Sequence, residues 1–197
     1  MMLVEETFVP ERALPVDALK RHLRLGRGFA EDDVQDEVLA SFLRAALAAV
    51  EARTGKALIR RAFLLSVREW SAGDVQNLPI APVASILGLD VVDRFGAVTA
   101  IDPLTVQLEA DAHFPRLKSV TSALSGIPSG GSAEVRFEAG YSTEFTGLPA
   151  DLRQAVLLLA AHYYEYRDET ALGQGCMPFG VSSLLARFRP MRLGARA

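Results

Sequence analysis

The hydrophobic pattern of this chain changes its period twice, and this limits the fold more than any other feature. Apolar residues recur at a helical spacing up to Gly55, then largely alternate, and return to the helical spacing at Leu148. A spacing near 3.6 residues predicts amphipathic helices, whereas alternation predicts half-buried strands. We therefore expect an α+β protein with a mainly helical core and an inserted small antiparallel β region.

Two helices are predicted before the first change of period. The first begins at Pro15, a favoured first helical residue, and ends near Gly26 or Gly28. The second begins at the acidic cluster of residues 31–33, where negative charge favours the start of a helix, and Gly55 caps its end. Three of its apolar residues are expected to face the helical core: Val38, Phe42 and Val50.

The middle of the chain, residues 58–142, is predicted to be the β region. Phe63, Leu65 and Val67 alternate with outward residues, and a Ser/Gly-rich loop at 125–132 precedes a second clear alternation. That second set is Val135, Phe137 and Ala139. The other expected strands are a hairpin of 89–92 and 97–101 around Asp93-Arg94-Phe95-Gly96, and the stretches 105–109 and 116–120.

A long helix is predicted from residue 148 to about Asp168, followed by a short one from Gly180 to Arg187. The long helix carries two adjacent apolar stripes, more than one core requires, so we expect it to be covered on two sides. The stripes are Leu152, Val156, Leu159, Tyr163 and Tyr166, and Ala155, Leu158 and His162. Residues 1–187, helical at 15–55 and 148–187, then form one domain, and residues 188–197 a basic tail.

Composition excludes several classes of protein. The net charge of -3 argues against a protein that grips nucleic acid through its phosphates, and the single cysteine, Cys176, cannot form an internal disulfide. The acidic residues of MMLVEETFVPER do not match an export signal, which predicts a cytosolic protein. The apolar run 155–161 is too short to span a membrane.

Few residues suggest catalysis or metal binding. His162, Glu165 and Asp168 follow one another at three-residue spacing, a pattern that can present a metal. The alternative is that His162 and Glu165 form hydrogen bonds in the core or to a neighbouring subunit. The surroundings of Cys176 supply no activating base, and no phosphate-binding loop occurs. We expect no catalytic residue, cofactor or metal, and retain a metal-dependent enzyme that uses His162 and Glu165 as the rival hypothesis.

The tyrosines of the long helix also have two interpretations. Tyr163, Tyr164 and Tyr166 could stack on bases, as aromatic residues do in single-strand binders. On a helix they point in different directions, which favours core packing and subunit contacts. A DNA-binding regulator would need a basic recognition helix, and the sequence offers none.

Several segments resemble one known family when they are taken together. They are Glu-Ala-Arg-Thr-Gly-Lys-Ala-Leu at 51–58, Leu-Pro-Ile-Ala-Pro-Val at 78–83, Phe-Glu-Ala-Gly-Tyr at 137–141, Leu-Pro-Ala-Asp-Leu-Arg-Gln-Ala from 148, Ala-His-Tyr-Tyr-Glu-Tyr-Arg-Asp at 161–168, Met-Pro-Phe-Gly-Val at 177–181 and Leu184-Leu185. The chain from about residue 15 to 190 resembles the head-tail connector (adaptor) proteins of long-tailed phages and of phage-derived gene transfer agents. The Ser/Gly loop and the tail depart from the family pattern.

The resemblance implies a structural protein. It implies a homo-oligomeric ring, typically of twelve subunits, that docks on the portal protein and extends the DNA channel toward stopper and tail proteins. Such a ring is assembled in the host cytoplasm and then resides in the particle, binds passing double-stranded DNA without sequence specificity, and involves no membrane. A stopper or tail-completion protein is the nearest alternative.

We expect two sets of residues to carry this function. The ring and core interface on the long helix is Leu152, Val156, Leu159, His162, Tyr163 and Tyr166. The portal-docking tail uses Arg187, Arg189, Met191, Arg192, Leu193 and Arg196, because its arginines would suit acidic grooves.

Overall fold

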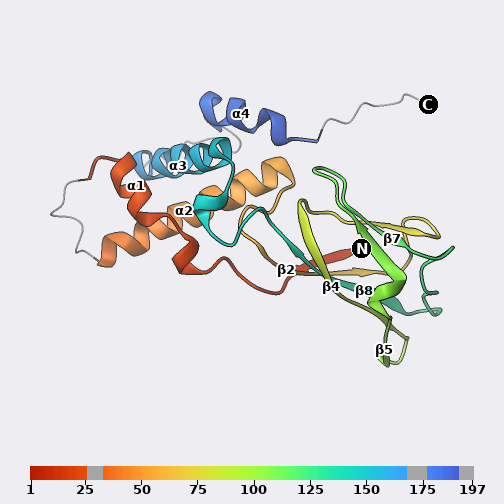
Figure 1. Cartoon of the computed structure of the whole chain (residues 1–197). Helices are drawn as coiled ribbons and strands as arrows, with labels where there is room; N and C mark the ends of the chain where they lie inside the picture. The colour runs from red at the N-terminus through yellow and green to blue at the C-terminus, as the bar shows by residue number, and fades with distance from the viewer. Residues whose placement is uncertain (26–32, 168–176, 191–197) are drawn as a thin grey trace. The chain divides into compact units, whose positions relative to one another are not determined.

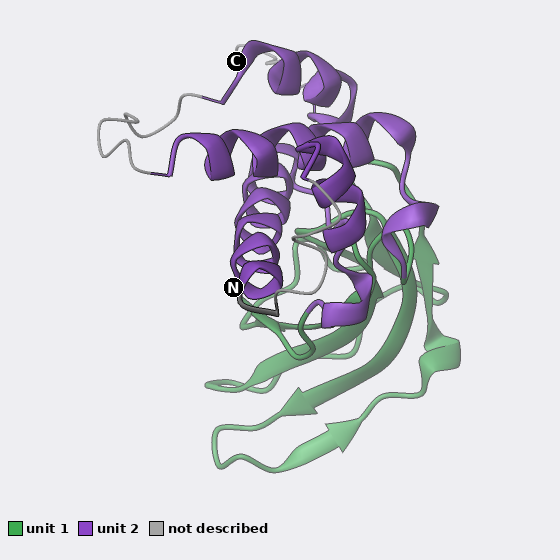
Figure 2. Cartoon of the chain, turned by 90° about the vertical axis from the view of Figure 1, so that its left-hand side faces the viewer, with its two compact units in different colours: residues 1–8, 59–143 green, residues 9–58, 144–197 purple. Residues whose placement is uncertain are grey.

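The computed structural model describes residues 1–25, 33–167 and 177–190 and divides the chain into two compact units. The first, here called the β unit, comprises residues 1–8 and 59–143, and the second, the helical unit, comprises residues 9–58 and 144–197 (Figure 2). The β unit is thus inserted between two helical stretches. It also takes in the first residues of the chain, to which the sequence pattern assigned no element.

A five-stranded antiparallel sheet makes up most of the β unit (Figure 1). Its central strand, β8 (Ser132–Ala139), lies between β2 (Arg61–Val67) and β4 (Val83–Val92). The outer strands are β1 (Met2–Glu5), beside β2, and β5 (Val98–Ala100), beside β4. The predicted hairpin is confirmed as β4 and β5, although β4 begins six residues earlier than the pattern indicated.

Alternation along β2 and β8 determines which side chains the sheet buries. Phe63 pairs with Phe137 in the register, and their rings stack with 5.8 Å between centroids. Phe63, Leu65 and Val67 are buried, as are Val135 and Phe137, whereas the intervening positions are only half-buried. A one-residue slip would turn all these side chains to the opposite face, so the pattern specifies the register.

A smaller antiparallel sheet completes the β unit. It has the order β3 (Val75–Asn77), β7 (Arg116–Ser119) and β6 (Val106–Glu109), with the short 3-10 helix η3 (Pro103–Thr105) before β6. The predicted strands at 105–109 and 116–120 are therefore confirmed, while β3 was missed. Leu117 is fully buried at the centre of this sheet.

Gly140 ends β8 at a place where no other residue fits. Its φ is +134°, and a Cβ built there would lie 2.5 Å from Cα of Arg60. The Gly140 N–H donates to the carbonyl of Pro82 at 2.9 Å. The close backbone approach therefore requires glycine.

The helical unit contains four described α-helices. They are α1 (Val16–His22), α2 (Asp33–Thr54), α3 (Ala150–Glu165) and α4 (Phe179–Leu185). Short 3-10 helices precede α1 (η1, Glu11–Ala13), precede α3 (η4, Phe145–Gly147) and follow α4 (η5, Ala186–Phe188). Helix α3 packs against α1, α2 and α4, so it occupies the centre of the unit.

Helix α2 confirms the predicted end at Gly55 but not the predicted core face. The Gly55 N–H donates to the carbonyl of Glu51 at 2.8 Å, and its φ of +67° suits glycine. Val50 is buried and Phe42 half-buried, but Val38 is 39% exposed, so its assignment to the core was wrong. The buried stripe runs one position later: Leu39, Leu43, Ala46, Leu47 and Val50.

Two parts of the predicted fold class need correction. The protein is α+β, but it is not mainly helical, because two antiparallel sheets form a complete unit of their own. Two helices are also shorter than expected: the long C-terminal helix α3 has 16 residues and ends at Glu165, and the N-terminal helix α1 ends at His22. The residues near Gly26 and Asp168 lie outside the described ranges.

Candidate functional site

Helix α3 carries five of the six residues predicted for the ring and core interface, and Tyr166 directly follows it. Leu152, Val156 and Leu159 are buried almost completely, and α1, α2 and α4 of the same chain cover the helix. Leu158, on the second stripe, is half-buried. The two stripes are thus covered on two sides, but by helices of the same chain. The buried part of this helix is therefore covered without a neighbouring subunit.

The aromatic end of α3 is only partly covered. His162 and Tyr163 are half-buried, and Tyr166 is 41% exposed. The ring of His162 lies 4.7 Å from that of Tyr166 and 6.4 Å from that of Tyr163, measured between centroids. Burial raises the pKa of Tyr163. These three side chains form a surface-accessible aromatic end, whereas Leu152, Val156 and Leu159 serve the core.

Tyr164 joins α3 to α2. Its ring meets that of Phe42 edge-on at 6.1 Å, and the guanidinium of Arg167 lies 4.9 Å from the Tyr164 centroid. The tyrosines therefore point to different surroundings, which does not provide the continuous platform that stacked bases need.

The residues of the rival metal hypothesis do lie near one another. His162, Glu165 and His22 line one pocket of about 400 Å³ beside the start of α4. Even so, no group of three ligands with metal-binding geometry occurs within the described ranges, and Asp168 lies outside them. Cys176 lies outside them too.

The described part of the basic tail is anchored at its base. Arg187 pairs with Asp151 of α3 at 3.0 Å, and its guanidinium lies 4.7 Å from the centroid of Phe188. Arg189 is exposed. The remaining predicted tail residues, Met191, Arg192, Leu193 and Arg196, fall outside the described residues.

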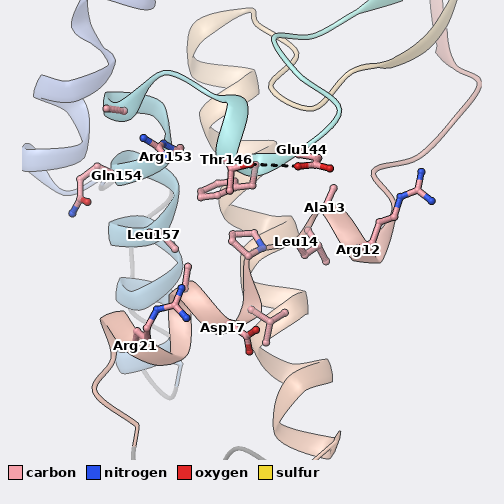
Figure 3. Close-up of a pocket in the computed structure, with 15 residues that line it drawn as sticks. Arg12, Ala13, Leu14, Asp17, Arg21, Glu144, Thr146, Arg153, Gln154 and Leu157 are labelled. Carbon is pink, nitrogen blue, oxygen red and sulfur yellow. Dashed lines mark hydrogen bonds between the residues drawn. The ribbon is translucent and has the colours of Figure 1, made fainter.

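A second pocket, which the sequence pattern did not predict, lies within the helical unit (Figure 3). It measures about 590 Å³, and Arg12 of η1, Arg21 of α1 and Arg153 of α3 stand around it. Its apolar lining includes Leu14, Phe145 and Leu157. We call it the arginine pocket.

One buried donor atom in the arginine pocket has no acceptor in the described part of the chain. The Nε of Arg153 is buried and has no hydrogen-bond partner among the described residues. Asp17 and Glu144 also line the pocket. Arg12 and Arg21 are exposed to solvent. Buried donors normally have acceptors, so the Nε of Arg153 remains available to an acceptor that enters the pocket. Only the tertiary structure brings these arginines together, so no local sequence pattern predicts the pocket.

No helix in the described ranges is long and apolar enough to cross a membrane.

Comparison with known proteins identifies close structural neighbours. A chain in the neck of an empty GTA particle, computed with C6 symmetry, is 47% identical, with a TM-score of 0.90. A chain in the virion of a native gene transfer agent (GTA) particle is 46% identical, with a TM-score of 0.86. A chain in the neck of a native GTA particle, computed with C12 symmetry, is 43% identical, with a TM-score of 0.85. Each alignment covers 100% of this chain and 99% of the other. No protein-family model and no curated protein matches the chain.

Proposed function

Because the chain belongs to the family of these GTA neck and virion proteins, we propose that it is a structural subunit of a particle neck, joining the DNA-filled head to the tail as a homo-oligomeric ring. Identity above 40% along the whole chain is the observation that carries this proposal. The function is architectural, not enzymatic.

The symmetries of the related neck structures support a ring. A chain without internal symmetry cannot lie on a rotation axis, so C6 and C12 reconstructions repeat it around that axis. Twelve copies satisfy both symmetries. We propose a dodecamer in which one face of each subunit meets a different face of the next, as a closed ring requires.

We further propose that the ring acts as the adaptor, docking on the portal and extending the DNA channel toward stopper and tail proteins. The chain's net charge of -3 suits a channel in which DNA must slide, since every phosphate contact strengthens binding. Assembly takes place in the host cytoplasm before the subunit enters the particle. The exposed Arg189 and the residues after it would supply the portal contact.

Removing the gene from a particle-producing strain tests the neck assignment. We expect filled heads and complete tails that fail to join, and complementation with the intact chain should restore joined particles. Electron microscopy of the protein mixed with its portal separates adaptor from stopper. An adaptor forms a ring directly on the portal, whereas a stopper binds only after another protein is present. Particles with joined heads and tails in the deletion strain would refute the neck function.

A further inference from the structure

We propose that the β4–β5 hairpin of one subunit docks into the arginine pocket of a neighbouring subunit. The occupant is the hairpin tip, residues 93–96 of a second copy, with Phe95 as its anchor. The inference rests on the proposed ring. It identifies the hairpin tip and the arginine pocket as the two different faces that meet between neighbouring subunits.

The hairpin tip presents its aromatic side chain in a rigid frame. Phe95 is 80% exposed, and the Arg94 guanidinium lies 4.5 Å from its ring centroid. One carboxylate oxygen of Asp93 accepts hydrogen bonds from the backbone N–H of Phe95, at 2.8 Å, and of Ala97, at 2.9 Å. A preorganised aromatic and arginine pair loses little entropy on binding and is typical of the residues that dominate interfaces.

The arginine pocket matches this tip in size and chemistry. About 590 Å³ is enough for an aromatic ring and its neighbours, and Leu14, Phe145 and Leu157 offer apolar contact to Phe95. Asp17 also lines the pocket, which provides an acceptor for Arg94. The hairpin in turn brings two carboxylates, Asp93 at the tip and Asp90 on β4, toward the arginines of the pocket.

The charges of the two units favour contact between unlike units. The β unit holds 11 of the chain's 24 acidic residues but only 7 of its 21 lysines and arginines. The helical unit holds the other 13 acidic residues and the other 14 lysines and arginines, so it is slightly basic. When the β unit of one subunit faces the helical unit of the next, like-charge repulsion is avoided. Repeating this contact around an axis gives a closed ring with heterologous interfaces.

Photo-crosslinking in assembled necks tests the contact directly. Phe95 is replaced by p-benzoylphenylalanine, and particles are assembled from a mixture of isotope-labelled and unlabelled subunits. After illumination, mass spectrometry should find mixed-label crosslinks to peptides that contain residues 12–21 or 144–157. Crosslinks confined to other segments or to other proteins, or none at all in particles that contain the protein, would overturn the proposal.

Substitutions on both sides provide an independent measurement. Phe95→Ala and the pair Arg21→Glu with Arg153→Glu should each lower incorporation into necks by about tenfold or more, as expected for hot-spot residues. The matched controls are Leu104→Ala, 84% exposed in the same unit as Phe95, and Arg53→Glu, an exposed arginine outside the pocket. Circular dichroism establishes that each variant folds. Normal incorporation of a folded Phe95→Ala protein would contradict this contact but leave the neck function intact, whereas absence of the unaltered protein from necks would refute the proposed function itself.

Discussion

Arg187, just after α4, pairs with Asp151 in the first turn of α3, with 3.0 Å between a guanidinium nitrogen and a carboxylate oxygen. The pair fastens the base of the basic tail to the central helix of the helical unit. Both side chains are more than a third exposed, at 63% and 37%, so water screens the interaction. It positions the start of the tail more than it stabilises the fold.

Asp151→Asn should therefore lower the free energy of unfolding by no more than about 1 kcal/mol. Part of that loss comes from the favourable position of a carboxylate at a helix start. Urea unfolding at low and at high salt measures it, and the difference between the two proteins should shrink as salt rises. A loss that is independent of salt would show that the ion pair is not its source.

Deleting residues 188–197 should leave the fold intact but weaken attachment to the portal. The deletion retains Arg187 and the four α-helices that the structure describes, and it removes the exposed Arg189 together with the arginines at 192 and 196. Thermal unfolding should change little, while a pull-down with the portal should recover much less protein. Unchanged recovery would remove the tail from the portal contact.

The burial of α3 predicts a large effect of truncating its core residues. Leu159→Ala should lower the free energy of unfolding by about 2–5 kcal/mol, because Leu159 is 1% exposed and the change leaves a cavity. Val38→Ala is the matched control on α2, where 39% exposure limits the expected loss to less than about 1 kcal/mol. Denaturant titration compares the two. Equal losses would contradict the observed face of α2.

Gly140→Ala should destabilise the β unit by about 2 kcal/mol or more. Alanine strains the backbone at φ +134°, and its Cβ would meet the Arg60 backbone at 2.5 Å. Gly73→Ala is the control, since a Cβ there meets nothing within 4 Å. Thermal unfolding of the two variants should differ clearly, and similar melting temperatures would refute the close approach at Gly140.

The raised pKa of Tyr163 predicts a stability difference at high pH. Below about pH 10 the phenol is protonated in both states, so its titration contributes nothing. Above that pH the unfolded state loses its proton first, because burial keeps the folded pKa higher. The free energy of unfolding should then fall as the pH rises through the folded pKa. Between pH 9 and 11, the free energy of unfolding of Tyr163→Phe, measured by urea unfolding, should fall less steeply than that of the unaltered protein. Parallel curves for the two proteins would exclude the effect.

Much of the fold follows from local pattern. Alternation at Phe63, Leu65 and Val67, the hairpin around Asp93, and the end of α2 at Gly55 were all predictable, because strand period, turn chemistry and helix caps depend on neighbouring residues. The buried face of α2 was not predictable in this way. A shift of one position moves a residue by about 100° around a helix, which changes Val38 from core to surface.

The sequence by itself thus determined the order of the helices and of most strands, the buried faces of β2 and β8 and, through its resemblance, a structural role. Only the tertiary structure decided that β1 completes the sheet, that α3 is covered within its own chain, and that Arg12, Arg21 and Arg153 surround one pocket. The physical reason is the separation along the chain over which each effect acts. Periodicity and capping act over a few residues, whereas a pocket depends on which distant segments the packing of apolar faces brings together.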